Sequence, residues 1–320
     1  MPRKVSIIVI SYNALDNLKE CLESLESLDY NEKEIIVVND ASTDGTSAFL
    51  ARYRSRTNTR IKVINNEKNL GVAGARNAGI QHASGEIMAF TDSDCVADMS
   101  WISELIQGYG HKDVAAVGGS ISDKRITNIW ELVRKGHDFI AHSEGYVPFI
   151  KGCNMSFDSK VLKKYMFDDE IKYGYEELLL CNNLIDDGYK IFYRPQARVH
   201  HKHRSNLRAL LKQIYLRGMS SIWYLKKRNK FFMYKRHFLL FCALLFIPFY
   251  IMHNLLLYLS FFLFFVSSFY LLLEEITFNR KSVKEILVTF PFIIFIEFFH
   301  FAGAIAGLIK FRVFKRIELK

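Results

Sequence analysis

Two aspartates at the end of a short apolar run are the first candidates for chemistry in this sequence. The run at residues 87–90 has the composition of a buried strand, and Asp92-Ser93-Asp94 follows it after Thr91. Two carboxylates held this close repel each other unless a cation lies between them, so a divalent metal is their natural partner. Oxygen ligands favour Mg²⁺ or Mn²⁺, and these ions in turn favour a phosphorylated substrate.

A second group of acids and hydroxyls follows the apolar run at residues 34–38. Asp40 comes at the end of that run, where a carboxylate can accept hydrogen bonds from a base or a ribose. Ser42, Thr43 and Asp44 come just before a predicted helix at residues 47–53. Capping of that helix is therefore an equal alternative for these three residues.

The glycine-rich stretch at residues 69–79 leads Arg76 into another predicted helix. Its backbone amides and the Arg76 guanidinium could meet a diphosphate. The glycines could equally serve close packing of the helix against a sheet.

Glu176 and Glu177 form another acidic pair, followed by leucines at helical spacing. Two carboxylates in the first turn of a helix complement its dipole, which accounts for the pair without any function. The functional alternative is a general base that reaches the hydroxyl of an acceptor.

Three histidines, His200, His201 and His203, follow a strand-like run at residues 190–193. They could be incidental members of a basic patch. Alternatively, one imidazole completes a metal site that begins with Asp94.

These residues need a scaffold that brings them together, and the pattern of apolar residues predicts one. Short β-branched runs at residues 5–10 and 34–38, and further predicted strands at 61–64, 87–90 and 115–118, alternate with helical patterns at 17–28, 47–53 and 73–81. This alternation predicts an α/β domain with a doubly wound, mostly parallel, Rossmann-like sheet. In such sheets ligands bind beyond the carboxyl ends of the strands. The residues expected there include Ser11, Tyr12, Asn13, Asn39, Asp40, Asn65, Asn66, Asp92 and Asp94.

Composition and charge divide the chain into two chemically different regions. The 320 residues carry a net charge of +10 and are 50% hydrophobic, which excludes disordered, collagen-like and coiled-coil proteins. Residues 202–236 contain eleven basic residues and no acidic one. A basic run before an apolar stretch is typical of the cytoplasmic side of a membrane, with nucleic-acid binding as the weaker alternative. The five cysteines form no C-x-x-C pair, which indicates reduced thiols in a cytosolic compartment, and the N-terminus reads as a strand rather than a signal peptide.

Two apolar runs near the C-terminus predict membrane-spanning helices. Residues 238–273 exceed the length needed for one crossing, so they predict either a hairpin turning at His253-Asn254 or a surface helix followed by one span. Residues 286–309 predict a further span, in which Gly303 and Gly307 permit close packing against a neighbouring helix. Buried helices of a soluble protein are the alternative. The predicted organisation is a domain at 1–203, a basic amphipathic surface segment at 204–237, two or three spans within 238–309, and a basic cytoplasmic tail at 310–320.

Taken together, these motifs resemble the family 2 glycosyltransferases, inverting enzymes of the GT-A fold that use nucleotide-diphospho-sugars. The segments that carry the resemblance, in chain order, are residues 5–13, 37–40, 69–79, 90–94, 152–154, 175–177 and the histidine cluster. The resemblance implies a nucleotide-sugar site made of Ser11, Tyr12, Asn13, Asp40, Asp44, Arg76, Asp92, Ser93, Gly119 and Asn154. Tyr12 and Asp40 would hold the base. Arg76 and Asp92 would lie at the ribose and phosphates, and Gly119 and Asn154 at the sugar and acceptor.

The resemblance also implies the chemistry. Asp94 and His201 would bind Mn²⁺ or Mg²⁺, with His200 and His203 as alternatives to His201. The family's usual catalytic base is an aspartate, and the matching residue here is Glu177, with Glu176 as a possible substitute. Glu177 would deprotonate the acceptor hydroxyl as it attacks the anomeric carbon, and inversion would follow.

The implied partners are a nucleotide-diphospho-sugar, with UDP as the family's general leaning, and a lipid-linked saccharide or glycolipid acceptor. The Gln-x-x-Arg-Trp motif of processive synthases is replaced by a sequence that runs from Gln213 to Gly218, which favours transfer of one sugar per encounter. We therefore expect a multi-pass protein of the inner membrane whose catalytic domain faces the cytoplasm and builds cell-surface polysaccharide or glycolipid, without nucleic acid. The alternatives are a nucleotidyltransferase and a membrane scaffold that has lost turnover.

Overall fold

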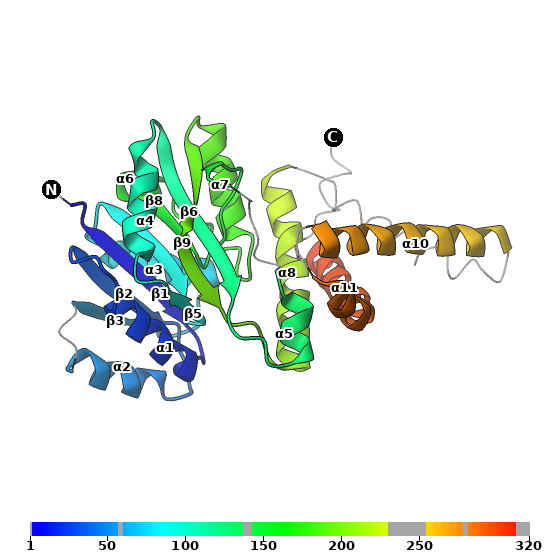
Figure 1. Ribbon diagram of the computed structural model, residues 1–320, viewed down its shortest axis with the longest axis horizontal. Helices are drawn as coiled ribbons and strands as arrows, with labels where there is room; N and C mark the ends of the chain where they lie inside the picture. The colour runs from blue at the N-terminus through cyan, green and yellow to red at the C-terminus, as the bar shows by residue number, and fades with distance from the viewer. Residues whose placement is uncertain (1, 57–59, 137–142, 230–253, 278–280, 312–320) are drawn as a thin grey trace. The chain divides into compact units, whose positions relative to one another are not determined.

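The computed structural model of this protein describes residues 2–56, 60–136, 143–229, 254–277 and 281–311, in two compact units (Figure 1). The first unit comprises Met1–Arg125 and Asp138–His203. The second comprises Ile126–His137 and Arg204–Lys320. Residues 126–137, which fall inside the predicted domain 1–203, therefore group with the helical C-terminal part of the chain.

Four parallel strands form one half of the sheet in the first unit. They are β1 (Val5–Ser11), β2 (Lys33–Asn39), β3 (Ile61–Asn65) and β4 (Ile87–Asp92), in the spatial order β3-β2-β1-β4. Their Val and Ile residues favour extended backbone and can be buried on both faces of a sheet. The register places Ser11 beside Asn39 and Ile10 beside Asp92, so the carboxyl ends of these strands lie at one edge. These are the strands that the sequence predicts.

Alternation along β1 builds a core layer on each face of the sheet. Ile7 packs in one layer with Leu22 of α1 (Leu15–Glu26), and Ile8 packs in the other with Ile80 of α3 (Gly71–His82). The first layer also takes residues from α2 (Thr46–Arg54) and α4 (Trp101–Gln107), and the second from α6 (Ser159–Tyr165) and α7 (Glu176–Asp186). Helices thus cover both faces, which confirms the predicted doubly wound α/β class.

Beyond β4 the sheet becomes mixed. β8 (Met155–Asp158) pairs antiparallel with β4 and with β6 (Val114–Asp123). β9 (Lys190–His201) runs parallel to β6 but antiparallel to β5 (Cys95–Ala97) and β7 (Gly145–Tyr146). A turn of 3-10 helix, η1 (Gly108–Gly110), follows α4. β9 shifts its register against β6 between Arg194 and Arg198, where Pro195 has no backbone N–H to donate.

The second unit consists of helices in its described residues: α5 (Ile129–Arg134), α8 (Leu207–Lys227), α10 (Asn254–Thr277) and α11 (Val283–Lys310). Glycines bring α8 and α11 into close contact. A Cβ on Gly218 would lie 1.9 Å from the carbonyl oxygen of His300, and a Cβ on Gly303 would lie 1.9 Å from that of Tyr215. The glycine motif of the second apolar run therefore packs against a helix of the same chain.

One helix among the residues searched, Val283–Lys310, is long and apolar enough to cross a membrane by length and composition. Residues 230–253 and 312–320 lie outside the described residues. They include the end of the predicted basic segment, part of the first apolar run with its turn at His253, and most of the tail. Large apolar side chains are exposed on α10 and α11, among them Phe262, Phe265, Phe269, Leu287 and Ile309.

Candidate functional site

Three potential metal ligands converge where β5 meets β9. The ligand atoms of Asp94, Cys95 and His201 all lie within 4.8 Å of one another, and His201 Nε2 is 3.6 Å from Asp94 Oδ1. The antiparallel pairing of the two strands produces this cluster, because it places Cys95 directly opposite His201. A carboxylate and an imidazole at this separation are compatible with joint binding of a divalent cation such as Mn²⁺. The residues present therefore fit the metal that the sequence predicts.

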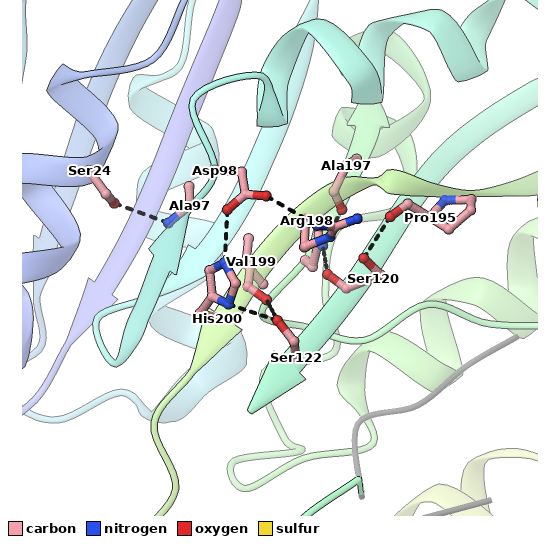
Figure 2. Close-up of polar contacts among 11 residues, drawn as sticks. Ser24, Ala97, Asp98, Ser120, Ser122, Pro195, Ala197, Arg198, Val199 and His200 are labelled. Atoms are coloured by element: carbon pink, nitrogen blue, oxygen red, sulfur yellow. Dashed lines mark hydrogen bonds and ion pairs between the residues drawn. The ribbon is translucent and has the colours of Figure 1, made fainter. Parts of the chain in front are cut away.

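Figure 2 shows that the neighbouring His200 is engaged elsewhere. Its Nε2 lies 2.8 Å from Asp98 Oδ1, and its Nδ1 lies 2.8 Å from Ser122 Oγ. Successive residues of a strand point to opposite faces of the sheet, so His200 and His201 serve different sides of β9. His203 Nε2 in turn lies 2.6 Å from Asp123 Oδ1. Of the three histidines, the geometry thus favours His201 as the metal ligand.

A buried arginine joins two of the predicted acids. Arg76 on α3 is only 2% exposed. Its Nη2 lies 3.2 Å from Asp92 Oδ1 and its Nη1 lies 2.5 Å from Glu176 Oε1. Gly152 leaves room for the guanidinium, because a Cβ there would lie 2.6 Å from Nη2. Arg76 therefore links the end of β4 to the start of α7. Its Nη1 and Nη2 groups both donate to carboxylates of the protein.

The acids around Arg76 carry more negative charge than one guanidinium offsets. Burial raises the pKa of Asp92, and Asp94 nearby raises it further, although Arg76 acts in the opposite direction. Burial and the charge of Glu177 raise the pKa of Glu176 to about 8. Burial is the largest cause of both shifts, so the folded protein favours the protonated forms of these two acids.

The two glutamates of α7 differ in availability. Each has a buried Oε2 with no hydrogen-bond partner among the residues that the structure describes. Glu176, however, is 2% exposed and gives Oε1 to Arg76, whereas Glu177 is only partly buried. Glu177 is therefore the better placed of the two to accept a proton from a bound molecule.

Asp40, which the sequence predicts to contact the nucleobase, uses both carboxylate oxygens for hydrogen bonds at the start of α3. Its Oδ1 accepts a hydrogen bond from the side chain of Asn66 at 2.8 Å and one from the amide of Leu70 at 2.9 Å. Its Oδ2 accepts from the amides of Leu70 and Gly71, each at 3.1 Å. This carboxylate satisfies amides that the helix itself leaves unpaired, so its contact with a base stays a prediction.

Hydrogen bonds join the loops that follow β1 and β2. The amide of Thr43 donates to Asn13 Oδ1, and the amide of Asn13 donates to Ser42 Oγ. Asp44 accepts from the amide of Leu15 at the start of α1, and also from the backbone and hydroxyl of Thr46 at the start of α2. Asp44 thus accepts from the first amide of each of two helices, and its contact with a donor stays a prediction.

Ser11, Tyr12 and Ser93 lie at the same strand ends. Tyr12 is 53% exposed, so its ring is open to a ligand. The hydroxyl oxygen of Ser11 is buried and has no hydrogen-bond partner among the described residues. Ser93 is buried between the two aspartates. Tyr12 is therefore the one member of this trio whose exposed surface suits direct contact with a donor.

Gly119 and Asn154 lie within the protein rather than on an open surface. Asn154 is fully buried, and its side chain accepts from Trp101 Nε1 and donates to the carbonyls of Ser120 and Ala197, each at 2.8 Å. A Cβ on Gly119 would lie 1.8 Å from the carbonyl oxygen of Ala197. Both residues hold β6 against β9, and their contact with a sugar stays a prediction.

Sequence reasoning did not single out Cys95, Trp101 or the steric role of Gly152. Cys95 directly follows Asp94, so the sequence shows that these two residues are neighbours. Its proximity to His201, however, depends on the pairing of β5 with β9, which lie far apart in the sequence. Trp101 is linked to Asn154 across 53 positions. No local pattern carries such contacts.

Comparison with known proteins gives a family match. Residues 6–168 match the family described as "Glycosyl transferase family 2". Glycosyltransferase AglE of Haloferax volcanii is 33% identical over 119 residues, which are 37% of this chain and 39% of that protein. Poly-beta-1,6-N-acetyl-D-glucosamine synthase of Staphylococcus epidermidis is 30% identical over 206 residues, 60% of this chain and 48% of that protein. The matched regions thus span less than half the length of these curated relatives.

Two solved structures share the fold. Mannosyltransferase PcManGT from Pyrobaculum calidifontis, solved with GDP-Man and Mn²⁺, superposes with a TM-score of 0.63 at 18% identity, covering 96% of this chain and 88% of that one. S. aureus TarS, residues 1–349 with UDP, gives a TM-score of 0.51 at 20% identity, covering 68% of this chain and 65% of that one. At these identities the likeness establishes the GT-A fold alone.

Proposed function

Because this chain belongs to glycosyl transferase family 2, we propose that it transfers a sugar from a nucleotide-diphospho-sugar to a membrane-associated acceptor. The observation that carries the proposal is the placement of Asp94 and His201 3.6 Å apart at the sheet edge where β4 ends. Similar structures hold a nucleotide-sugar with Mn²⁺ or a nucleotide, which supports a nucleotide donor. They differ in the base, GDP in one and UDP in the other, and we propose UDP-sugars as the first donors to test.

The proposed reaction is a single displacement with inversion at the anomeric carbon. Asp94 and His201 would hold Mn²⁺ or Mg²⁺. The diphosphate leaves with the bonding electron pair, and a cation held by these two residues would offset its negative charge. Glu177 accepts the proton of the acceptor hydroxyl while that oxygen attacks the anomeric carbon. Arg76 holds Glu176 and Asp92 in place, and Tyr12 offers an exposed ring to the nucleobase.

We further propose that the acceptor is a lipid-linked saccharide or a glycolipid, and that one sugar is transferred per encounter. Support comes from the apolar helix Val283–Lys310 and from the exposed phenylalanines of α10. In this proposal residues 1–203 supply the catalytic domain, 204–237 lie on the membrane surface, 238–309 supply two or three spans, and 310–320 form a tail. The catalytic domain would face the cytoplasm at the inner membrane, where nucleotide-sugars are made.

Release of nucleoside diphosphate by the full-length protein in detergent tests the proposal. UDP-, GDP- and dTDP-sugars are offered with Mn²⁺ or Mg²⁺ and with extracted bacterial lipids as acceptors. Asp94→Asn should reduce release from the preferred donor at least a hundredfold, while the matched surface variant Asp169→Asn should leave it unchanged. Undiminished release in Asp94→Asn would remove the metal role. Pyrophosphate release from a triphosphate would indicate a nucleotidyltransferase, and failure to bind any nucleotide would indicate an inactive scaffold.

A further inference from the structure

A third potential ligand, Cys95, lies at the proposed metal site. β5 and β9 are antiparallel, and Cys95 is paired with His201 across them. Side chains of directly opposed residues project to the same face of a sheet, with Cβ atoms about 4.5–5.5 Å apart. Asp94 immediately precedes Cys95 in the chain. Two short backbone segments therefore present an oxygen, a sulfur and a nitrogen to one point.

The distances suit a small ion bound by all three atoms. Asp94 Oδ1 is 3.6 Å from His201 Nε2 and 4.0 Å from Cys95 Sγ. In a tetrahedral site with ordinary metal–oxygen, metal–nitrogen and metal–sulfur bonds, these separations are about 3.4 and about 3.6 Å. The two observed distances exceed these values by about 0.2 and about 0.4 Å, and the ligand atoms of Cys95 and His201 lie within 4.8 Å of each other. Binding of one ion by all three atoms therefore requires the side chains of Cys95 and His201 to move closer together.

We propose that Cys95 is a third metal ligand, so that the site binds thiophilic divalent cations such as Zn²⁺ and Co²⁺ in preference to Mg²⁺. The inference rests on the proposed function, because it concerns the same metal site. Mg²⁺ is bound through oxygen, whereas sulfur with imidazole and carboxylate is a donor set suited to Zn²⁺. The thiol proton passes to solvent when the metal–sulfur bond forms. Three protein ligands leave the fourth position of a tetrahedral ion open for a donor phosphate oxygen.

The neighbouring thiol provides a matched control. Cys153 lies close enough to Cys95 to raise the pKa of the Cys95 thiol, together with burial of that thiol. Both cysteines are buried, at 1% and 7% exposure, and both are free thiols. Cys153 is not part of the group of potential ligands found among the described residues. Replacing each cysteine in turn therefore separates coordination by Cys95 from a general effect of losing a thiol at this place.

The experiment is a titration of the reduced, metal-free, full-length protein in detergent with Co²⁺, followed by absorption spectroscopy. Coordination by a thiolate gives a sulfur-to-cobalt charge-transfer band in the near ultraviolet, and bound Co²⁺ gives weaker d–d bands in the visible. We expect both in the unaltered protein and in Cys153→Ser. Cys95→Ser should lose the charge-transfer band but keep the d–d bands, and it should bind Zn²⁺ at least tenfold more weakly. Asp94→Asn keeps the sulfur and nitrogen ligands, so it should bind Co²⁺ more weakly but retain the charge-transfer band.

If a variant fails to fold, the spectrum of the unaltered protein alone still tests whether a thiolate binds the metal. Bound Co²⁺ with d–d bands and no charge-transfer band would overturn the assignment of Cys95 and leave the proposed metal site standing. A band that survives in Cys95→Ser, or that disappears in Cys153→Ser, would assign the thiolate to another residue. No Co²⁺ binding at all would overturn both the third ligand and the metal site. Displacement of Mn²⁺ by stoichiometric Zn²⁺ that is stronger in the unaltered protein than in Cys95→Ser, measured by the Mn²⁺ paramagnetic resonance signal, would support the proposal independently.

Discussion

Arg76 offers a direct test of whether the buried charges at this site are structural or bind the donor. The sequence pattern allows a contact with diphosphate, whereas the structure gives Arg76 two internal partners, Asp92 and Glu176. In Arg76→Met both carboxylates keep their places but lose the charge that faces them. Arg76→Lys keeps the charge and loses the two-pronged guanidinium geometry.

The expected loss of stability follows from burial. Removing one partner from a buried ion pair costs roughly 3–5 kcal/mol. Arg76 has two partners, but the pKa of Glu176 already lies near 8, so Glu176 takes a proton and relieves part of the cost. We therefore expect Arg76→Met to lose about 3–5 kcal/mol of unfolding free energy, the cost of one broken pair, rather than twice that amount. For a domain of 150–250 residues each kcal/mol moves the Tm by about 2–4 °C, so Arg76→Met should lower it by about 6–20 °C.

Thermal unfolding of the full-length protein in detergent measures this effect, with the exposed Arg54→Met on α2 as the matched control. Arg76→Lys should fall between Arg76→Met and the unaltered protein. Adding Glu176→Gln to Arg76→Met removes one of the stranded acids, so the double variant should be more stable than additivity predicts, by about 1–3 kcal/mol. This reasoning would be refuted if the Tm of Arg76→Met lay within about 2 °C of that of the unaltered protein while its nucleotide affinity fell tenfold or more. That result would assign Arg76 to binding of the diphosphate.

Two further predictions concern the pH response of the site and the packing of the second unit. Between about pH 4.5 and 8 folded Glu176 retains a proton that the unfolded chain has released, so the free energy of unfolding should fall as pH rises, by at most about 1.4 kcal/mol per unit. Urea unfolding at several pH values should show this slope, and Glu176→Gln should flatten it; an unchanged slope would assign it to another group. Gly303→Ala places a methyl group against the carbonyl of Tyr215, so it should destabilise α8 against α11 by about 1–3 kcal/mol. Circular dichroism melting should detect the loss, with the exposed Ala302→Val as control, and equal melting of all three proteins would contradict the close packing.

The parallel half of the fold could be predicted because its information is local. The Val and Ile runs of β1, β2 and β3 and the apolar run of β4 are bounded by polar residues, and the helices between them have a clear apolar period. β5 and β8 are only three and four residues long, and neither has enough length to show a period. Their positions depend on pairing with β9, β4 and β6, which no short window of sequence contains.

The same distinction explains the site. Asp92 and Asp94 could be placed because ligand-binding residues follow the strands of a doubly wound sheet. The choice among the three histidines needed the register of β9. In that register His200 contacts Asp98, whereas His201 lies beside Asp94. The diphosphate contact of Arg76 stays a prediction, but its contact with Glu176 could not be foreseen, because Glu176 lies 100 positions away. A buried ion pair of that span is invisible to local reasoning.

The crowding of acids at the sheet edge also bears on why the site should attract a cation. Asp92, Asp94, Glu176 and Glu177 come together through the fold, and Arg76 is the buried guanidinium that faces them. Burial is the largest cause of the raised pKa of Asp92 and of Glu176, and excess negative charge from Asp94 and Glu177 adds to it. A divalent ion between Asp94 and His201 would offset that excess at the place where the diphosphate of a donor also needs positive charge. Folding thus concentrates negative charge at a cost in stability, and that charge provides the electrostatic attraction for the metal on which the proposed reaction depends.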